Sequence, residues 1–165
     1  METNKKDAKE LFSVKKDMYD ACPDKVDGAY SYCEGYKKFL DSAKTEREAV
    51  REGIAMAEKA GYAEYRLGDA LSAEGKYYFN NRDKCLYVFK IGTGDINRNG
   101  IRIAAAHIDS PRLDLKQVPL YEDSGMCFLK THYYGGIKKY QWTTIPLALH
   151  GVIINAAGEK KEICV

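Results

Sequence analysis

The spacing of apolar residues changes at Gly61, and this change limits the folds that the chain can adopt. Before Gly61, apolar residues recur at helical intervals, whereas after it the apolar stretches are short and are separated by turn residues. The predicted strands are residues 76–80, 85–91, 101–107, 126–134 and 152–155, with a return strand at 160–165. Helices followed by strands predict an α/β or α+β fold.

Two apolar stripes predict two helices near the amino terminus. Pro23 should separate them, because proline cannot donate the helical hydrogen bond and its ring clashes with the preceding turn. The stripes are formed by Leu11, Val14, Met18 and Cys22, and by Val26, Tyr30, Cys33 and Leu40.

A third helix is predicted between Thr45 and Gly61. Thr45 and Glu48 form a capping box, in which each side chain can accept a hydrogen bond from the backbone of the other. Gly61 is placed to end the helix as its left-handed cap. The stripe expected to be buried is Val50, Ile54 and Ala57.

The composition is that of an ordinary globular protein. The 165 residues carry 26 basic and 24 acidic side chains, so the net charge of +2 selects no class of partner. Neither a secretory signal nor a membrane-spanning run is visible in the sequence, and we therefore expect a cytoplasmic protein. Five cysteines, without a C-x-x-C pair, are expected to be reduced and to fill the core.

The glycine-containing loop at residues 92–100 is interpreted as a plain turn. It opens with Gly-x-Gly, but Asn97 stands where a phosphate-binding loop needs its third glycine. The loop also leads into a predicted strand instead of a helix.

His107 and Asp109 are the principal candidates for chemistry. Residues 103–107 read as a strand buried on both faces, which His107 ends. Side chains two apart on an extended chain share a side, so Asp109 can hydrogen-bond one ring nitrogen while the other binds a metal. The alternative, that a histidine and an aspartate have this spacing by chance and bind no metal, stays open.

The remaining candidates are weaker. His132 and His150 read as structural or surface histidines, although a three-histidine zinc site stays open. Aromatic rings and lysines in residues 132–142 could bind nucleic acid, but the near-neutral charge argues against it. Carboxylates that could supply oxygen ligands, and that more simply read as solvated, are Asp114, Glu122 and Asp123.

Three stretches of the sequence resemble one known family. HIDSPRLDLK at 107–116, PLYED at 119–123 and LKTHYYGG at 129–136, continuing to Trp142, closely resemble the aminopeptidase I and aspartyl aminopeptidase family of zinc metallopeptidases. The resemblance extends from the amino-terminal helices to Val165. One departure is Ile108, where relatives commonly carry threonine.

The resemblance implies a cytosolic exopeptidase that acts on peptides with two divalent metal ions, usually zinc. It further implies an α/β fold, in which residues 1–113 hold amino-terminal helices and part of a mostly parallel catalytic sheet. Residues 114–165 would begin an inserted β domain used in oligomerisation, commonly into dodecamers. Neither nucleic acid nor a membrane is expected as a partner.

Carried over to this sequence, the resemblance makes His107 the first metal ligand and Asp109 the catalytic residue that orients it. The other ligands and the general-base glutamate of the family match no residue here. We therefore expect a truncated chain that is inactive alone, also because a carboxyl-terminal strand at 160–165 would lack its next partner. The alternative is a non-catalytic remnant that serves in assembly.

Overall fold

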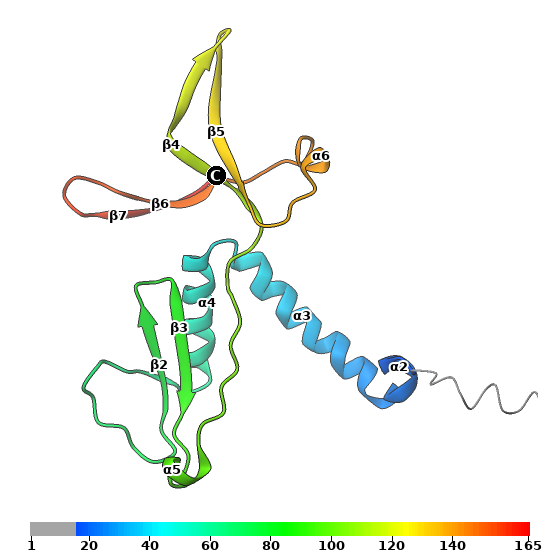
Figure 1. Ribbon diagram of the computed structural model, residues 1–165, viewed down its shortest axis with the longest axis vertical. Coiled ribbons are helices and arrows are strands. Elements are labelled where there is room, and N and C mark those ends of the chain that lie inside the picture. The colour runs from blue at the N-terminus through cyan, green and yellow to red at the C-terminus, as the bar shows by residue number, and fades with distance from the viewer. Residues whose placement is uncertain (1–15) are drawn as a thin grey trace, which may run out of the picture. The chain divides into compact units, whose positions relative to one another are not determined.

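The computed structural model describes residues 16–165, which form one compact unit that ends at Lys38 and a second from Phe39 to Val165 (Figure 1). Leu11 and Val14 of the first predicted stripe lie outside the described residues. Within the part of the chain that is described, no helix has both the length and the apolar character needed to span a bilayer.

Helices at the start of the described chain are separated at Pro23, as predicted. Helix α2 (Met18–Ala21) is capped by Asp17, whose carboxylate accepts the Asp20 amide at 2.9 Å. The short 3₁₀ helix η1 (Pro23–Lys25) has Pro23 at its first position and leads into helix α3 (Val26–Ser42). Proline thus ends one helix and starts the next.

Helix α4 (Glu46–Lys59) begins and ends with the predicted caps. Both halves of the capping box are formed, with Thr45 accepting the Glu48 amide and Glu48 accepting the Thr45 amide. At the other end, Gly61 has a φ of +82°, a left-handed conformation that favours glycine. The amides of Gly61 and Tyr62 donate to the Glu58 and Ala57 carbonyls, which is the Schellman arrangement.

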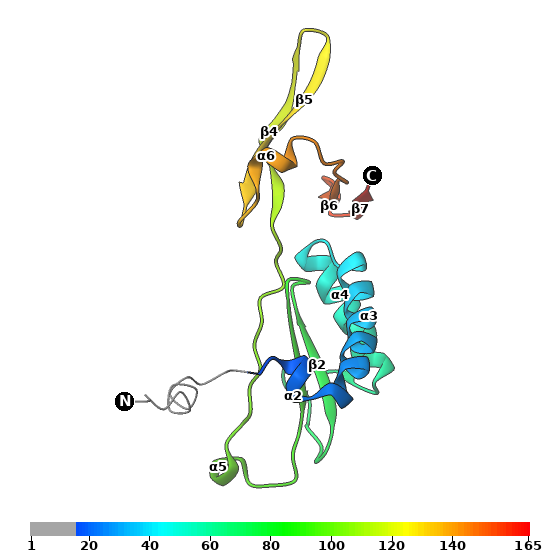
Figure 2. The same ribbon diagram turned by 90° about the vertical axis from the view of Figure 1, so that its right-hand side faces the viewer.

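Helix α4 packs on a three-stranded sheet, and the core lies between them (Figures 1 and 2). Strand β1 (Ala63–Glu64) is parallel to β2 (Lys76–Asn81), which is antiparallel to β3 (Cys85–Lys90). A β-carbon on Gly53 would lie 2.7 Å from Leu86 Cδ2, so the helix approaches β3 closely there. The buried core consists of Ala49, Val50, Ala57 and Tyr78, and Ile54 is half-buried.

A long hairpin follows, of which the sequence predicted one strand. Strand β5 (Met126–Tyr134) has the predicted bounds, whereas β4 (Arg112–Asp123) was not anticipated. Ser124 and Gly125 form the turn, both with positive φ, as a type I′ hairpin turn requires. The short helix α6 (Lys139–Trp142) comes after β5.

The carboxyl-terminal residues form the predicted second hairpin, of β6 (His150–Ile154) and β7 (Lys160–Cys164). Asn155 shapes its turn, because its side-chain oxygen accepts the amides of Ala157 and Glu159 at 3.0 and 2.8 Å. The loop at 92–100 contains the single-turn helix α5 (Ile96–Asn99). It does not lead into a longer helix of the kind that follows a phosphate-binding loop.

The predicted buried strand at residues 101–107 is wrong. These residues form no strand, and Ile103 is 77% exposed. A strand buried on both faces needs neighbouring strands, and within residues 16–165 strand β3 pairs with β2 only. The segment is therefore paired with no strand, and its residues are exposed.

The cysteines also differ from expectation. All five are free thiols, but they do not fill the core, because Cys22 is half-buried and the other four are exposed. The described core is small and is made of alanine, valine and tyrosine side chains.

Tyr78 carries the one polar group of this core. The residue is 6% exposed, and its hydroxyl donates to Glu58 Oε1 at 2.7 Å. That hydrogen bond, together with burial, raises the pKa of Tyr78 to about 12. The protonated phenol therefore stabilises the folded state, fully below about pH 10 and progressively less as the pH rises towards the folded pKa.

We expect Tyr78→Phe to lower the free energy of unfolding at neutral pH by about 1 kcal/mol, the typical value of one hydrogen bond. Between about pH 10 and the folded pKa, the wild-type free energy should decrease with a steeper slope than that of the variant. Urea unfolding followed by circular dichroism measures both. The exposed Tyr140 supplies the control, since Tyr140→Phe should keep the wild-type slope; equal slopes in all three proteins would contradict the prediction.

Candidate functional site

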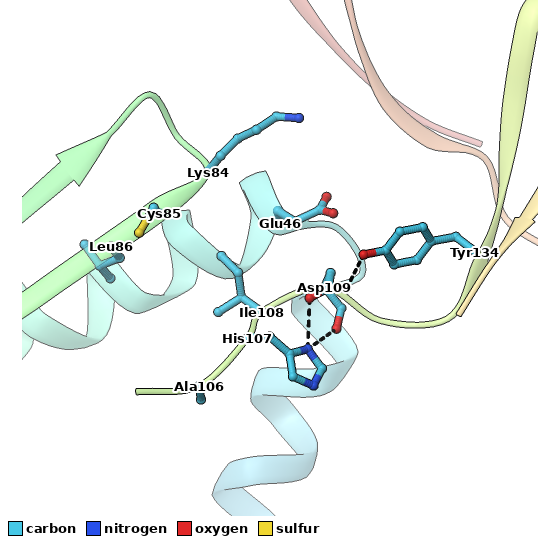
Figure 3. Close-up of a pocket in the computed structure, with 9 residues that line it drawn as sticks. All are labelled: Glu46, Lys84, Cys85, Leu86, Ala106, His107, Ile108, Asp109 and Tyr134. Atoms are coloured by element: carbon cyan, nitrogen blue, oxygen red, sulfur yellow. Dashed lines mark hydrogen bonds and ion pairs between the residues drawn. The ribbon is translucent and has the colours of Figure 1, made fainter. Parts of the chain in front are cut away.

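His107 and Asp109 lie at an open cavity of about 360 Å³ where the segment after α5 passes the start of β3 (Figure 3). Cys85 and Leu86 line it from β3, Glu46 from α4, and Tyr134 from the end of β5. The His107 side chain is 82% exposed and that of Asp109 is 30% exposed. The imidazole of His107 at this cavity is therefore accessible to solvent.

The predicted contact between His107 and Asp109 is present. His107 Nδ1 lies 2.9 Å from Asp109 Oδ1 and 3.0 Å from the Asp109 backbone oxygen. A carbonyl and a carboxylate only accept hydrogen bonds, so this network assigns the proton to Nδ1. The lone pair of Nε2 is then free to bind a metal ion or another electron-pair acceptor.

Tyr134 holds the other oxygen of the same carboxylate. Its hydroxyl donates to Asp109 Oδ2 at 2.6 Å, as the dashed line in Figure 3 marks. This hydrogen bond is the main cause that lowers the pKa of Asp109, and the same contact raises the pKa of Tyr134. Asp109 is therefore a charged acceptor fixed on both sides.

Arg112 connects this group to helix α4. Its guanidinium carbon lies 4.3 Å from the centre of the Tyr134 ring, a cation–π contact. Its Nη2 is 3.0 Å from Glu46 Oε1, and its Nε donates to Asp114 Oδ1 at 2.7 Å. The chain of contacts runs from α4 through Arg112, Tyr134 and Asp109 to His107.

The other predicted ligands have different surroundings. His150 lies 2.8 Å from Glu48, and the ring of the exposed His132 lies 5.4 Å from that of Tyr133, tilted by 34°. The carboxylate of Asp114 binds Arg112, whereas Glu122 and Asp123 accept hydrogen bonds from Gly125 and Ser124 at the hairpin turn. None of these five side chains lines the cavity at His107.

The aromatic and lysine residues of 132–142 also contact one another. Lys139 Nζ lies 3.9 Å from the centre of the Tyr133 ring, so this cation and this ring face are used within the chain. The nucleic-acid alternative gains no support from that contact.

Tyr134, Glu46 and the role of Arg112 were not found from the sequence. Tyr134 is 25 residues from Asp109, and Glu46 is in the first turn of a helix where acidic residues are common. The only available signal was that Tyr134 and Arg112 both belong to the stretches that carry the family resemblance.

Zinc usually takes at least three protein ligands. Among residues 16–165, no group of three or more histidine, cysteine, aspartate or glutamate side chains could hold a metal ion. His107 fits one nitrogen-ligand position, with its Nδ1 proton already bound by Asp109. A complete zinc site does not fit the described residues by themselves.

Comparison with known families agrees with the resemblance. The family model described as aminopeptidase I zinc metalloprotease (M18) matches residues 39–165, which are the second compact unit. A probable M18 family aminopeptidase of Clostridium acetobutylicum is 47% identical over 161 residues, which cover 94% of this chain and 34% of the relative. A second, from Thermotoga neapolitana, is 45% identical over 81% of this chain and 29% of the relative.

Solved structures of the family share the fold. The M18 aminopeptidase of Thermotoga maritima has a TM-score of 0.80 at 36% identity, covering 93% of this chain and 33% of that one. Aminopeptidase I of Borrelia burgdorferi has a TM-score of 0.79 at 37% identity, over 86% and 35%. The chain spans about a third of the length of these relatives. The α/β class is therefore correct, and the chain belongs to the aminopeptidase I zinc metalloprotease (M18) family.

Proposed function

We propose that this chain is the amino-terminal third of a zinc-dependent aminopeptidase that removes amino-terminal residues from peptides. In this proposal His107 is a metal ligand and Asp109 orients it. The observation that carries it is the pair of Asp109 oxygens at 3.0 Å or less from His107 Nδ1, which leaves Nε2 free at an exposed position.

The family description supports zinc as the metal, and two bound divalent ions would supply Lewis-acid polarisation of the scissile carbonyl and a water nucleophile at neutral pH. The residues of this chain contribute orientation. Asp109 fixes the imidazole, Tyr134 fixes Asp109, and Arg112 ties Tyr134 to Glu46. Such supporting contacts typically change metal affinity or activity by about 10–100-fold when they are removed.

We further propose that the chain alone is inactive. His107 supplies a single ligand, and the other ligands and the general base would come from the two thirds of the relatives that this chain does not match. The experiment must therefore join the two portions.

The inserted β domain and oligomerisation are part of the same proposal. Residues 114–165 would begin that domain, and a cytoplasmic homo-oligomer, a dodecamer in the family, would form. Leu120 and Leu129, opposite each other on β4 and β5, leave an exposed apolar pair that supports an assembly surface.

The central prediction uses a chimera of residues 1–165 with the remaining two thirds of the Clostridium acetobutylicum relative. The chimera should release amino-terminal residues from short peptides in a zinc-dependent reaction, and residues 1–165 alone should not. His107→Ala should abolish turnover, and Asp109→Asn should lower kcat/KM by about 10–100-fold. Tyr134→Phe should lower it by about tenfold.

Zinc content by atomic absorption provides a second measurement, which should fall in the same order. The exposed His132 offers a matched control, since His132→Ala should leave both activity and zinc content unchanged. Near-normal turnover of the His107→Ala chimera would refute the site. A folded but inactive chimera with full zinc content would favour the non-catalytic assembly role.

A second prediction concerns the His107 tautomer in this chain as it stands. Long-range proton–nitrogen correlation at about pH 8, above the usual histidine range, should find the proton on Nδ1. Asp109→Asn retains an oxygen acceptor and should preserve this tautomer, whereas Asp109→Leu leaves only the backbone carbonyl and should lower its population. A dominant Nε2–H form in the wild-type chain would contradict the proposed ligand atom.

The assembly surface gives a third prediction. In the chimera, Leu120→Lys combined with Leu129→Lys should shift sedimentation towards smaller species, because charges would replace the apolar pair of the proposed interface. Ile96→Lys, an equally exposed apolar position on α5, is the control and should sediment as the parent does. An unchanged oligomer in the double variant would place the interface elsewhere.

A further inference from the structure

A second group of reactive side chains lies apart from the His107 cavity, where β6 and β7 meet the start of α4. His150 Nδ1 is 2.8 Å from Glu48 Oε1, and His150 Nε2 is 3.9 Å from Cys164 Sγ, at the outer limit of a hydrogen bond that involves sulfur. A thiol, an imidazole and a carboxylate thus follow one another in the order of nucleophile, base and orienting group. Cys164 is exposed, whereas the side chains of His150 and Glu48 are mostly buried.

The strand register explains the contact between thiol and imidazole. His150 and Cys164 are directly opposed on the antiparallel pair β6–β7. The next pair, Leu149 and Val165, exchanges two backbone hydrogen bonds of 2.8 and 3.0 Å. His150 and Cys164 therefore form a non-hydrogen-bonded pair, the kind in which opposed side chains approach most closely.

The capping box of α4 holds the carboxylate in place. Glu48 Oε2 accepts the amides of Lys44 and Thr45 at 3.0 and 2.9 Å, which leaves Oε1 for His150. Partial burial raises the pKa of Glu48, but the hydrogen bonds from His150 and Thr45 outweigh it and hold the pKa below its usual range. A charged Glu48 accepts the Nδ1 proton of His150, so the lone pair of Nε2 faces the thiol.

The charges around Cys164 are few. Glu162, two residues earlier on the same face of β7, is paired with Arg51 at 2.8 Å. Lys160, two residues further back, is paired with Asp83 at 3.2 Å. Because those charges have partners, His150 is the group placed to take the thiol proton.

We propose that Cys164 is a nucleophilic thiol, with His150 as its general base and Glu48 as the group that orients the base, and that it reacts with small aliphatic disulfides. In the reaction His150 Nε2 takes the thiol proton while the sulfur attacks one sulfur of the disulfide. The disulfide bond breaks, Cys164 is oxidised to the mixed disulfide, and the leaving thiolate takes the proton from His150. Atoms and electrons balance without another reactant.

Cys127 is the internal reference for this proposal. It is also an exposed strand cysteine, but Glu122 opposes it on β4 where His150 opposes Cys164. A carboxylate disfavours a neighbouring thiolate, whereas a base assists it. The two thiols therefore test the effect of the partner within one molecule.

The test measures alkylation by iodoacetamide at about pH 7, with each cysteine followed by peptide mass spectrometry in the chain of 165 residues. Relative to its own rate in urea, Cys164 should react on the order of tenfold faster than Cys127. His150→Gln should bring Cys164 to the rate of Cys127, and Glu48→Gln should slow it several-fold. Oxidised glutathione should then add one glutathionyl group to Cys164 before it modifies Cys127.

The rate of Cys127 and the circular dichroism spectrum control for loss of structure. A variant in which both are unchanged and only Cys164 slows supports the assigned roles. If His150→Gln disturbs the fold, the wild-type ratio of Cys164 to Cys127 still decides. Equal normalised rates of the two thiols in the wild-type chain, or an unchanged Cys164 rate in a folded His150→Gln protein, overturn the proposal.

Discussion

The position of His107 depends on the carboxylate of Asp109. Residues 101–110 form no strand or helix, so no backbone ladder holds the imidazole at the cavity. The carboxylate binds the ring on one side and the Tyr134 hydroxyl on the other, and Arg112 then joins Tyr134 to helix α4. These short-range contacts hold the imidazole in place of a sheet, and the negative charge of Asp109 strengthens the two hydrogen bonds that it accepts.

Helix α4 connects the parts of the second compact unit, and it does so mainly through polar side chains of its first two turns. Glu46 binds Arg112, Arg47 binds Asp83, Glu48 binds His150, and Arg51 binds Glu162. The apolar face of the same helix packs on β2 and β3 through Val50 and Ala57. One helix therefore combines the core with the attachment of both hairpins.

The sequence predicts the elements whose signals are local. Thr45, Glu48 and Gly61 mark the ends of α4 because caps are satisfied within a few residues. The strand expected at 101–107 fails because its apolar residues specify burial only when neighbouring strands cover them. Strand β4 was not predicted because Pro119 interrupts the alternation of its sequence. In the structure the strand continues through a register shift between Leu115 and Leu120, where Val118 has a positive φ. At the site, the pair His107–Asp109 is local and was found, whereas Tyr134 and Glu46 approach only through the fold.

The double use of Glu48 has a consequence for the order of events during synthesis. One carboxylate oxygen closes the start of α4 with residues three and four positions away, and the other binds a histidine 102 positions later. At about 5–20 residues per second, a ribosome delivers that histidine roughly 5–20 seconds after the glutamate. The residues that close the start of α4 are therefore all synthesised before His150. The β6–β7 hairpin can bind Glu48 only afterwards.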